Sequence, residues 1–391
     1  MKYNFDEVIN RRRTASVKWD LTEQRFGAPD ILPMWVADMD FRSPVEVIEA
    51  VKARAELGIY GYTVRPDGLY EALINWEKQR HGWEIREEWI VPSPGVVTSL
   101  SILIETLTEP GDGVIIMPPV YHPFYDVIRL NNRRIVRNPL MLENGQYRIN
   151  FEQLEQLMAE GAKCLLFCSP HNPGGRVWTR EELGRVGELA LKYHIPVICD
   201  EIHQDLIFKG HKHTPLASVS EDIANITATC VAPSKTFNIA GLNTSFAIIP
   251  NREMRNKYVH RTRALSLDMN AFFGSFATEA CYRYGADWLD QLLEYLEGNL
   301  ETTLAFFAQH LPQCKVVKPE GTYLVWVDCS AISSDPEVLK KLMYQEARIA
   351  FNEGSMFGDE GRGYLRINIA CPRSLLKEGL QRFADAVKRT A

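Results

Sequence analysis

Five short apolar runs in the middle of the chain each stop abruptly at polar or turn-forming residues. They cover residues 113–117, 164–168, 197–199, 228–232 and 245–249. Continuous apolar runs of this length are typical of strands that are buried on both faces, as in a parallel sheet. The pattern therefore predicts a central, mainly parallel sheet.

Helical patterns alternate with these runs. Apolar residues recur on one face of a predicted helix over residues 151–160, and Thr179 and Glu182 have the spacing of a capping box at the start of another. Strands that alternate with helices predict a layered α/β fold. In such folds ligands bind beyond the carboxyl ends of the strands, where several polar residues follow the apolar runs.

The two ends of the chain have a different pattern. Residues 1–45 form an irregular arm rich in Trp, Pro and Asp, and a long helical pattern after residue 285 leads into alternating strands and helices. We therefore expect a large domain at residues 46–284. We expect a smaller α+β unit to be assembled from residues 1–45 and 285–391.

Composition narrows the function classes. The 391 residues are 46% hydrophobic and 24% charged, which is ordinary for a globular protein and excludes whole-chain disorder. The net charge of −6 and the absence of a basic block argue against nucleic-acid binding. The apolar runs are far shorter than the roughly 20 residues of a membrane span, and the N-terminus has no apolar signal core. We expect a cytoplasmic protein without a membrane or nucleic-acid partner.

The cysteines are expected to be buried, reduced and structural, because no two of them form a C-x-x-C pair and most lie in apolar runs. Without paired close spacings they do not predict a zinc site. They are Cys164, Cys168, Cys199, Cys230, Cys281, Cys314, Cys329 and Cys371.

Four polar segments are candidates for chemistry. Ser93-Pro94-Gly95 predicts a helix start whose free amides can bind a phosphate, although a plain helix cap explains it equally. Asn172 lies in an Asn-Pro-Gly-Gly turn and is either functional or a turn cap. Asp200 ends an apolar run, and its spacing to nearby His residues fits no metal-ligand motif, so we predict no metal.

Lys235 is the fourth candidate. It lies between a predicted buried strand and an apolar, glycine-containing stretch at residues 237–242. An isolated lysine is ordinarily a surface residue. Its apolar neighbours favour a buried, functional lysine instead.

In combination these segments resemble the fold-type I pyridoxal-5′-phosphate (PLP) enzymes of the aspartate-aminotransferase-like superfamily. The MalY/PatB cystathionine β-lyase (C–S lyase) branch is the most similar. The resemblance implies a mainly parallel seven-stranded sheet flanked by helices, with a smaller α+β domain. Its motifs are Trp35-Val36-Ala37-Asp38-Met39-Asp40-Phe41, Gly58-Ile59-Tyr60-Gly61-Tyr62, Asn172-Pro173, Asp200-Glu201-Ile202-His203, Ser234-Lys235-Thr236-Phe237-Asn238 and Arg366-Ile367-Asn368-Ile369-Ala370-Cys371-Pro372.

The resemblance assigns the cofactor ring to five residues. Lys235 holds PLP covalently through its amine, and Asp200 pairs with the pyridinium nitrogen and keeps it protonated. Asn172 donates to the ring 3′-oxygen, and Tyr121 stacks on the ring unless it is simply a core tyrosine. His203 stands where aminotransferases have a tyrosine that shares the 3′-oxygen.

The resemblance also indicates which residues bind the cofactor phosphate and the substrate. The amides of Val96 and Val97 bind the phosphate, together with the hydroxyls of Ser234 and of Tyr62 from a partner subunit. Asn243 replaces an arginine that holds the phosphate in many relatives. Arg366 grips the substrate α-carboxylate as a bidentate fork, or else forms a surface salt bridge.

The implied function is α,β-elimination of L-cystathionine or L-cysteine-type substrates to a thiol, pyruvate and ammonia. Lys235 removes the Cα proton, and Lys235 or Tyr121 protonates the leaving thiolate. The resemblance further implies a homodimer. The alternatives are a class I/II aminotransferase, which shares the first steps, and a regulatory protein that acts through protein contacts.

Overall fold

The computed structural model describes residues 3–390; residues 1, 2 and 391, which belong to the predicted smaller unit, lie outside the described part. Its centre is a seven-stranded sheet in the order β2-β10-β9-β8-β7-β3-β4. The strands are β2 (Ile90–Ser93), β3 (Gly113–Ile116), β4 (Arg134–Arg137), β7 (Cys164–Cys168), β8 (Val197–Asp200), β9 (Thr227–Val231) and β10 (Ser245–Ile248).

All strands of this sheet run in one direction except β10, which is antiparallel to both of its neighbours. The predicted mainly parallel seven-stranded sheet is thus confirmed. The antiparallel β10 shows that burial on both faces does not by itself require a strand to be parallel to its neighbours. Only the short helix α10 (Pro233–Thr236) and a 3₁₀ turn connect β9 to β10. A parallel connection usually requires a longer crossover helix.

Helices cover both faces of the sheet. Alternate side chains of each strand point to opposite faces, so Ile198 packs with α5 (Val96–Leu107), whereas Val197 and Cys199 pack against the other layer. The first layer also contains α6 (Pro123–Leu130) and α11 (Arg252–Ala264). The second layer consists of α7 (Phe151–Ala159), α8 (Arg180–Lys192) and α9 (Glu221–Ile226).

Two helix starts test the sequence predictions. The capping box of Thr179 and Glu182 at the start of α8 is confirmed. The start predicted at Ser93 is wrong by two residues, because Ser93 is the last residue of β2 and pairs with Ser245. Gly95 is the N-cap of α5 instead.

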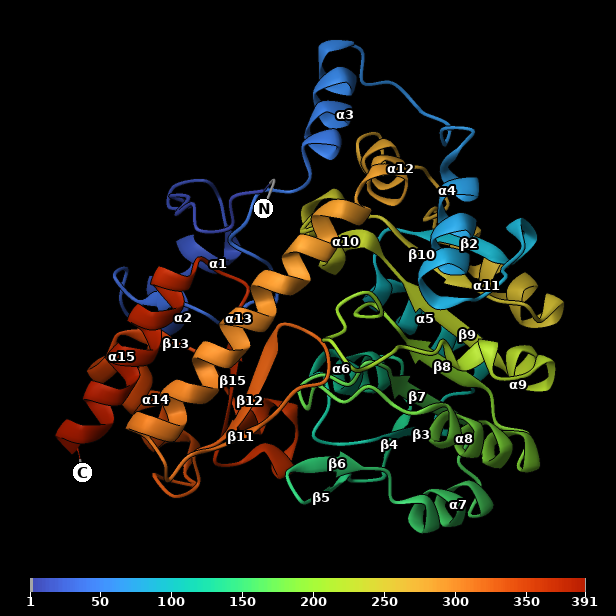
Figure 1. Ribbon diagram of the computed structural model, residues 1–391. Helices are drawn as coiled ribbons and strands as arrows, with labels where there is room; N and C mark the ends of the chain where they lie inside the picture. Colours follow the sequence, from blue (N-terminus) through green and yellow to red (C-terminus); the bar gives the residue numbers. More distant parts are fainter. Residues whose placement is uncertain (1–2, 391) are drawn as a thin grey trace.

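A second sheet contains residues from the C-terminal part, in the order β11-β12-β15-β14. The N-terminal arm joins this part through the parallel pair β1–β13, and Figure 1 shows the blue arm beside the red C-terminal elements. These contacts support the proposed division into residues 46–284 and the two chain ends. The strands are β1 (Leu32–Pro33), β11 (Lys315–Val317), β12 (Leu324–Asp328), β13 (Ile349–Ala350), β14 (Asn352–Glu353) and β15 (Tyr364–Asn368).

The remaining elements surround these two sheets. The helices are α1 (Val17–Asp20), α2 (Thr22–Phe26), α3 (Val45–Glu56), α4 (Leu69–Trp76), α12 (Gly274–Tyr284), α13 (Ala286–His310), α14 (Pro336–Lys341) and α15 (Arg373–Thr390), and β5 (Met141–Glu143) pairs with β6 (Gln146–Arg148). All eight cysteines are buried and free of disulfides, as predicted. Within residues 3–390 no helix combines the length and the apolar character needed to cross a membrane.

Candidate active site

The segments that follow β7, β8 and β9 meet at a cavity of about 260 Å³. They meet because the carboxyl ends of parallel strands lie at the same edge of a sheet. Eight of the ten predicted site residues line this cavity: Val96, Val97, Tyr121, Asn172, Asp200, His203, Ser234 and Lys235.

Asp200 lies at the end of β8 with only 3% of its surface exposed. Its Oδ1 accepts a hydrogen bond from the Ile202 amide at 3.2 Å, and no cation lies at ion-pair distance among the described residues. Burial raises the pKa of Asp200 to about 7, although the Ile202 amide and Lys235 oppose this rise. The site therefore contains a buried carboxylate that lacks a cationic partner.

Lys235 is held at the cavity by α10, which begins directly after β9. Its Nζ donates to the carbonyl oxygen of Ala37 at 2.7 Å. Burial lowers the pKa of Lys235 to about 8, with Arg366 contributing and Asp38 and Asp200 opposing. An amine with this pKa is partly unprotonated near neutral pH, as a nucleophile or base requires.

The N-terminus of α5 forms one wall of the cavity. The first hydrogen bond of this helix runs from the Ser99 amide to the Gly95 carbonyl at 3.1 Å, so the amides of Val96, Val97 and Thr98 precede it. These amides and the positive end of the helix dipole suit an anion. Ser234 lines the same cavity and offers a hydroxyl.

Arg366 lies on β15, beside the cavity rather than in its lining. Its Nη1 donates to Asn172 Oδ1 at 3.0 Å, and its Nη2 donates to Asn352 Oδ1 at 2.7 Å and to the Trp35 carbonyl at 3.1 Å. The Nε has no hydrogen-bond partner among the described residues, and burial lowers the pKa of the guanidinium to about 10. A buried arginine without a carboxylate partner is not a surface salt bridge, so that alternative is wrong.

Tyr121 lies just before α6 and His203 just after β8, and both line the cavity. Burial and the charge of Asp200 raise the pKa of Tyr121. Burial, with Lys235 and Arg366 nearby, lowers the pKa of His203 to about 3, so its imidazole is neutral at physiological pH. Its Nδ1 has no partner within residues 3–390, and its ring packs edge-on against Tyr323 with centroids 6.0 Å apart.

Tyr62 is the predicted site residue that the chain does not bring to the cavity. Its side chain is 97% exposed, in the loop after α3. Conversely, seven lining residues are not among the ten predicted site residues: Ala37, Pro94, Gly95, Thr98, Cys168, Ile202 and Asn243. Two of them could have been predicted from the family resemblance. Ala37 lies in the motif at residues 35–41, and Asn243 occupies the position where many relatives have a phosphate-binding arginine.

Comparisons with known proteins extend over the whole chain. The model of the family "Aminotransferase class I and II" matches residues 30–383. Cystathionine β-lyase PatB of Bacillus subtilis (strain 168) is 45% identical over 385 residues, which cover 98% of this chain and 100% of PatB. Protein MalY of Escherichia coli (strain K12) is 33% identical over 390 residues, which cover 99% of each chain.

A solved structure agrees with these relatives. The crystal structure of cystalysin from Treponema denticola, which contains a pyridoxal 5′-phosphate cofactor, has a TM-score of 0.96 and 39% identity, and the match covers 100% of both chains. The fold predicted from the motifs is confirmed by this likeness and by the seven-stranded sheet. The chain therefore belongs to the aminotransferase class I and II family, within the branch that includes PatB and MalY.

Proposed function

We propose that the protein is a PLP-dependent carbon–sulfur β-lyase of the cystathionine β-lyase type. Its substrates are L-cystathionine or L-cysteine-type amino acids, and its products are a thiol, pyruvate and ammonia. The observation that carries this proposal is a single buried site that joins Lys235, Asp200 and Arg366, in a chain that matches PatB over its full length. The cavity of about 260 Å³ suits a small-molecule substrate, and we propose that the enzyme acts in the cytoplasm.

The unsatisfied groups of the cavity fit PLP. Asp200 needs a cationic partner, which the protonated ring nitrogen supplies, and the free amides at the start of α5 need an anion, which the phosphate supplies. Among residues 3–390 the Lys235 amine has the Ala37 carbonyl as its one hydrogen-bond partner, and it is available to react with an aldehyde. His203 Nδ1 offers a further polar contact.

When bound, PLP supplies an electron sink for the carbanion that forms at the substrate Cα. Asp200 would keep the proton on the ring nitrogen, and Tyr121, which also lines the cavity, would contact the ring. Arg366 binds the substrate α-carboxylate through the face that carries its unpartnered Nε. The Lys235 amine takes the proton from Cα, and Lys235 or the Tyr121 hydroxyl protonates the departing sulfur.

The decisive experiment gives the purified holoenzyme L-cystathionine without any keto acid. We expect sustained release of pyruvate and thiol over many turnovers, because elimination regenerates the cofactor. An aminotransferase would instead stop after one turnover with no thiol released. A parallel reaction with an added 2-oxo acid is the control, and the release of thiol should not depend on it.

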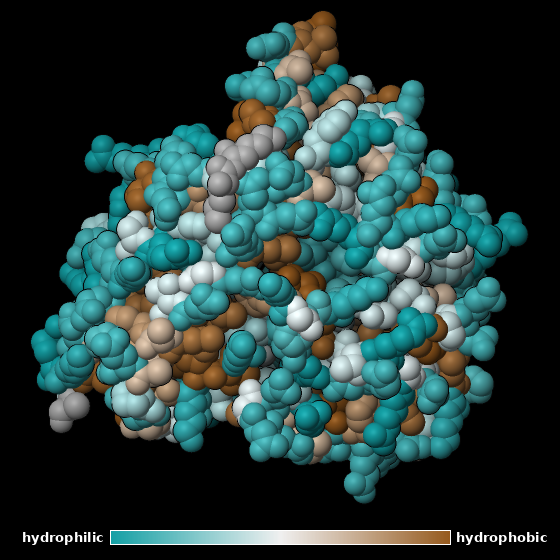
Figure 2. All heavy atoms as spheres, in the orientation of Figure 1, coloured by the Kyte–Doolittle hydropathy of each residue, from teal (hydrophilic) through white to brown (hydrophobic). Residues whose placement is uncertain are grey.

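The exposed loop after α3 supports a homodimer. Apolar and aromatic side chains are exposed here, and in Figure 2 brown hydrophobic residues lie at the end of the projection formed by α3. The exposed residues of this loop are Leu57, Ile59, Tyr60, Tyr62 and Val64, and exposed Met269, from the loop between α11 and α12, lines one surface pocket with Tyr60 and Tyr62. Such a patch is typical of a protein interface, and a second copy of the chain would bury it and bring Tyr62 to the phosphate end of the neighbouring cavity.

We expect sedimentation analysis to give the mass of two chains.

Tyr62→Phe should weaken cofactor binding by about 1 kcal/mol, roughly fivefold in Kd, because one hydrogen bond to the phosphate is lost. Tyr60→Phe is the matched control, since the Tyr60 hydroxyl donates to Ala55 of its own chain. Equal cofactor affinity of the Tyr62→Phe variant and the parent would contradict the assignment.

A further inference from the structure

Residues 35–41 form an irregular, bent segment of the N-terminal arm, named here the 35–41 segment, beside the active-site cavity. The carbonyl oxygen of Trp35 accepts from Arg366 Nη2, and that of Ala37 accepts from Lys235 Nζ. One stretch of backbone thus touches both the proposed catalytic amine and the proposed carboxylate-binding guanidinium. Its position decides where these two cations point.

Neighbouring side chains fix the segment on the side of the cavity. Asn368 Nδ2 donates to the carbonyl oxygens of Val36 and Asp38 at 2.6 and 2.7 Å, and the Tyr323 hydroxyl donates to Ala37 at 2.9 Å. These partners all satisfy backbone groups. None of these partners neutralises the two carboxylates of the segment, Asp38 and Asp40.

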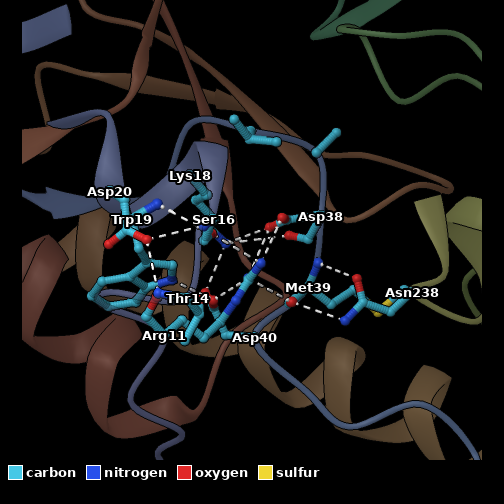
Figure 3. A network of polar contacts seen from close by, with 12 residues as sticks. Arg11, Thr14, Ser16, Lys18, Trp19, Asp20, Asp38, Met39, Asp40 and Asn238 are labelled. Atoms are coloured by element: carbon cyan, nitrogen blue, oxygen red, sulfur yellow. Dashed lines mark hydrogen bonds and ion pairs between the residues drawn. The ribbon is translucent and has the colours of Figure 1, made fainter. Parts of the chain in front are cut away.

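Two cations of the N-terminal arm neutralise these carboxylates, as Figure 3 shows. Lys18 Nζ lies 2.7 Å from Asp40 Oδ2 and 3.4 Å from Asp38 Oδ1. Arg11 lies 2.9 Å from Asp38 Oδ2 and 2.7 Å from Asp40 Oδ1, and Trp19 Nε1 also donates to Asp40 at 2.7 Å. We name Arg11, Lys18, Asp38 and Asp40 the ion cluster.

The ion cluster also grips the backbone directly. Lys18 Nζ donates to the Asp38 carbonyl at 3.2 Å, and Arg11 Nη1 donates to the Met39 carbonyl at 3.0 Å. Lys18 and Asp40 are 1% and 2% exposed, respectively. A buried ion pair is a poor source of stability compared with apolar packing of the same volume, but it accepts few geometries. A cluster of two cations and two anions therefore specifies where the segment lies.

We propose that Lys18 and Arg11 are positioning residues for the reaction, which hold the 35–41 segment so that its carbonyl oxygens orient Lys235 and Arg366. The inference rests on the proposed function for the identity of the substrate, but not for the placement of the segment. Loss of Lys18 leaves two carboxylates with one cation, and the uncompensated charge draws the segment towards water. A displacement of about 1 Å at reacting groups lowers rates on the order of 10²-fold.

The test is Lys18→Met in the holoenzyme, because Met keeps the length and the apolar stem of the side chain. Arg42→Gln is the matched control. Arg42 directly follows the segment, but its ion pair with Glu7 is exposed, and such a pair contributes little. For each variant we would measure kcat and KM for L-cystathionine, and hydrogen–deuterium exchange of peptides that contain residues 35–41 and residues 164–168.

We expect kcat/KM of Lys18→Met to fall on the order of 10²-fold, through both kcat and KM, because the segment orients Lys235, the proposed base, as well as Arg366, which holds the substrate carboxylate. The 35–41 peptide should exchange faster, since the Met39 and Asp40 amides donate to Asn238 and Ala370 in this arrangement. The 164–168 peptide and the Arg42→Gln control should match the parent.

Unchanged exchange of the 35–41 peptide, or equally faster exchange of both peptides, would overturn the proposal, as would an unchanged kcat/KM. If Lys18→Met does not fold, Arg11→Gln gives the same readouts, because the Arg11 side chain is 23% exposed and tolerates a polar replacement. A parent that releases no thiol would defeat the proposed function alone. The exchange experiment would still decide the role of the ion cluster.

Discussion

Lys235→Ala is expected to stop the release of pyruvate from L-cystathionine and to remove the visible absorbance of the bound cofactor. The buried amine of Lys235, with its pKa of about 8, is the proposed attachment point and the proposed base. Alanine supplies neither function, so kcat should fall by at least on the order of 10⁴-fold. Steady-state kinetics and an absorption spectrum of the purified variant measure both effects.

Two further variants distinguish the loss of the Lys235 amine from the loss of its positive charge and from the general effect of replacing a lysine. Lys235→Arg keeps the positive charge but has no free amine near neutral pH, so it should be as inactive as the alanine variant. Lys212→Ala removes an exposed lysine and should behave like the parent. Retained cofactor absorbance in Lys235→Ala would remove the central assignment.

Asp200→Asn is expected to lower kcat on the order of 10²- to 10³-fold and to weaken cofactor binding. An amide cannot balance the charge of a protonated ring nitrogen, so the electron sink loses strength. The steady-state rate and the cofactor released on dialysis are the measurements. A variant with parental kcat would contradict the proposed pairing.

The same substitution has the opposite effect on the protein without cofactor. The pKa of Asp200, about 7, lies above its ordinary value of 3.8, so between these pH values the folded state holds a proton that the unfolded chain has released. The free energy of unfolding of the parent should therefore fall as the pH rises through this window. Asparagine removes this dependence.

Above pH 7 the cofactor-free Asp200→Asn variant should thus be more stable than the cofactor-free parent by on the order of a few kcal/mol. Glu77, whose pKa burial also raises to about 7, is present in both proteins and cancels in the difference. Denaturant unfolding at several pH values measures the effect. A difference that does not change with pH would show that Asp200 is ionised in the folded, cofactor-free protein.

Local patterns in the chain were sufficient for most of the central fold. Buried strands follow from apolar runs because side chains alternate between two helix-covered faces. The capping box at Thr179 depends only on residues three positions apart and was predicted correctly. The start of α5 was predicted wrongly, and the antiparallel direction of β10 within the mainly parallel sheet was not predicted, because a strand pairing and a connection decide them rather than local pattern.

The sequence by itself determined where polar residues follow the predicted strands, and the resemblance of its motifs to PLP enzymes assigned roles to Lys235, Asp200 and Arg366. Only the tertiary structure decided what surrounds them. The 35–41 segment meets Lys235, Arg366 and the ion cluster through contacts between residues up to 331 positions apart. Long-range hydrogen bonds and desolvation depend on how the whole chain packs, so no local pattern predicts that Lys18 is buried against Asp40 or that the Ala37 carbonyl accepts from the Lys235 amine.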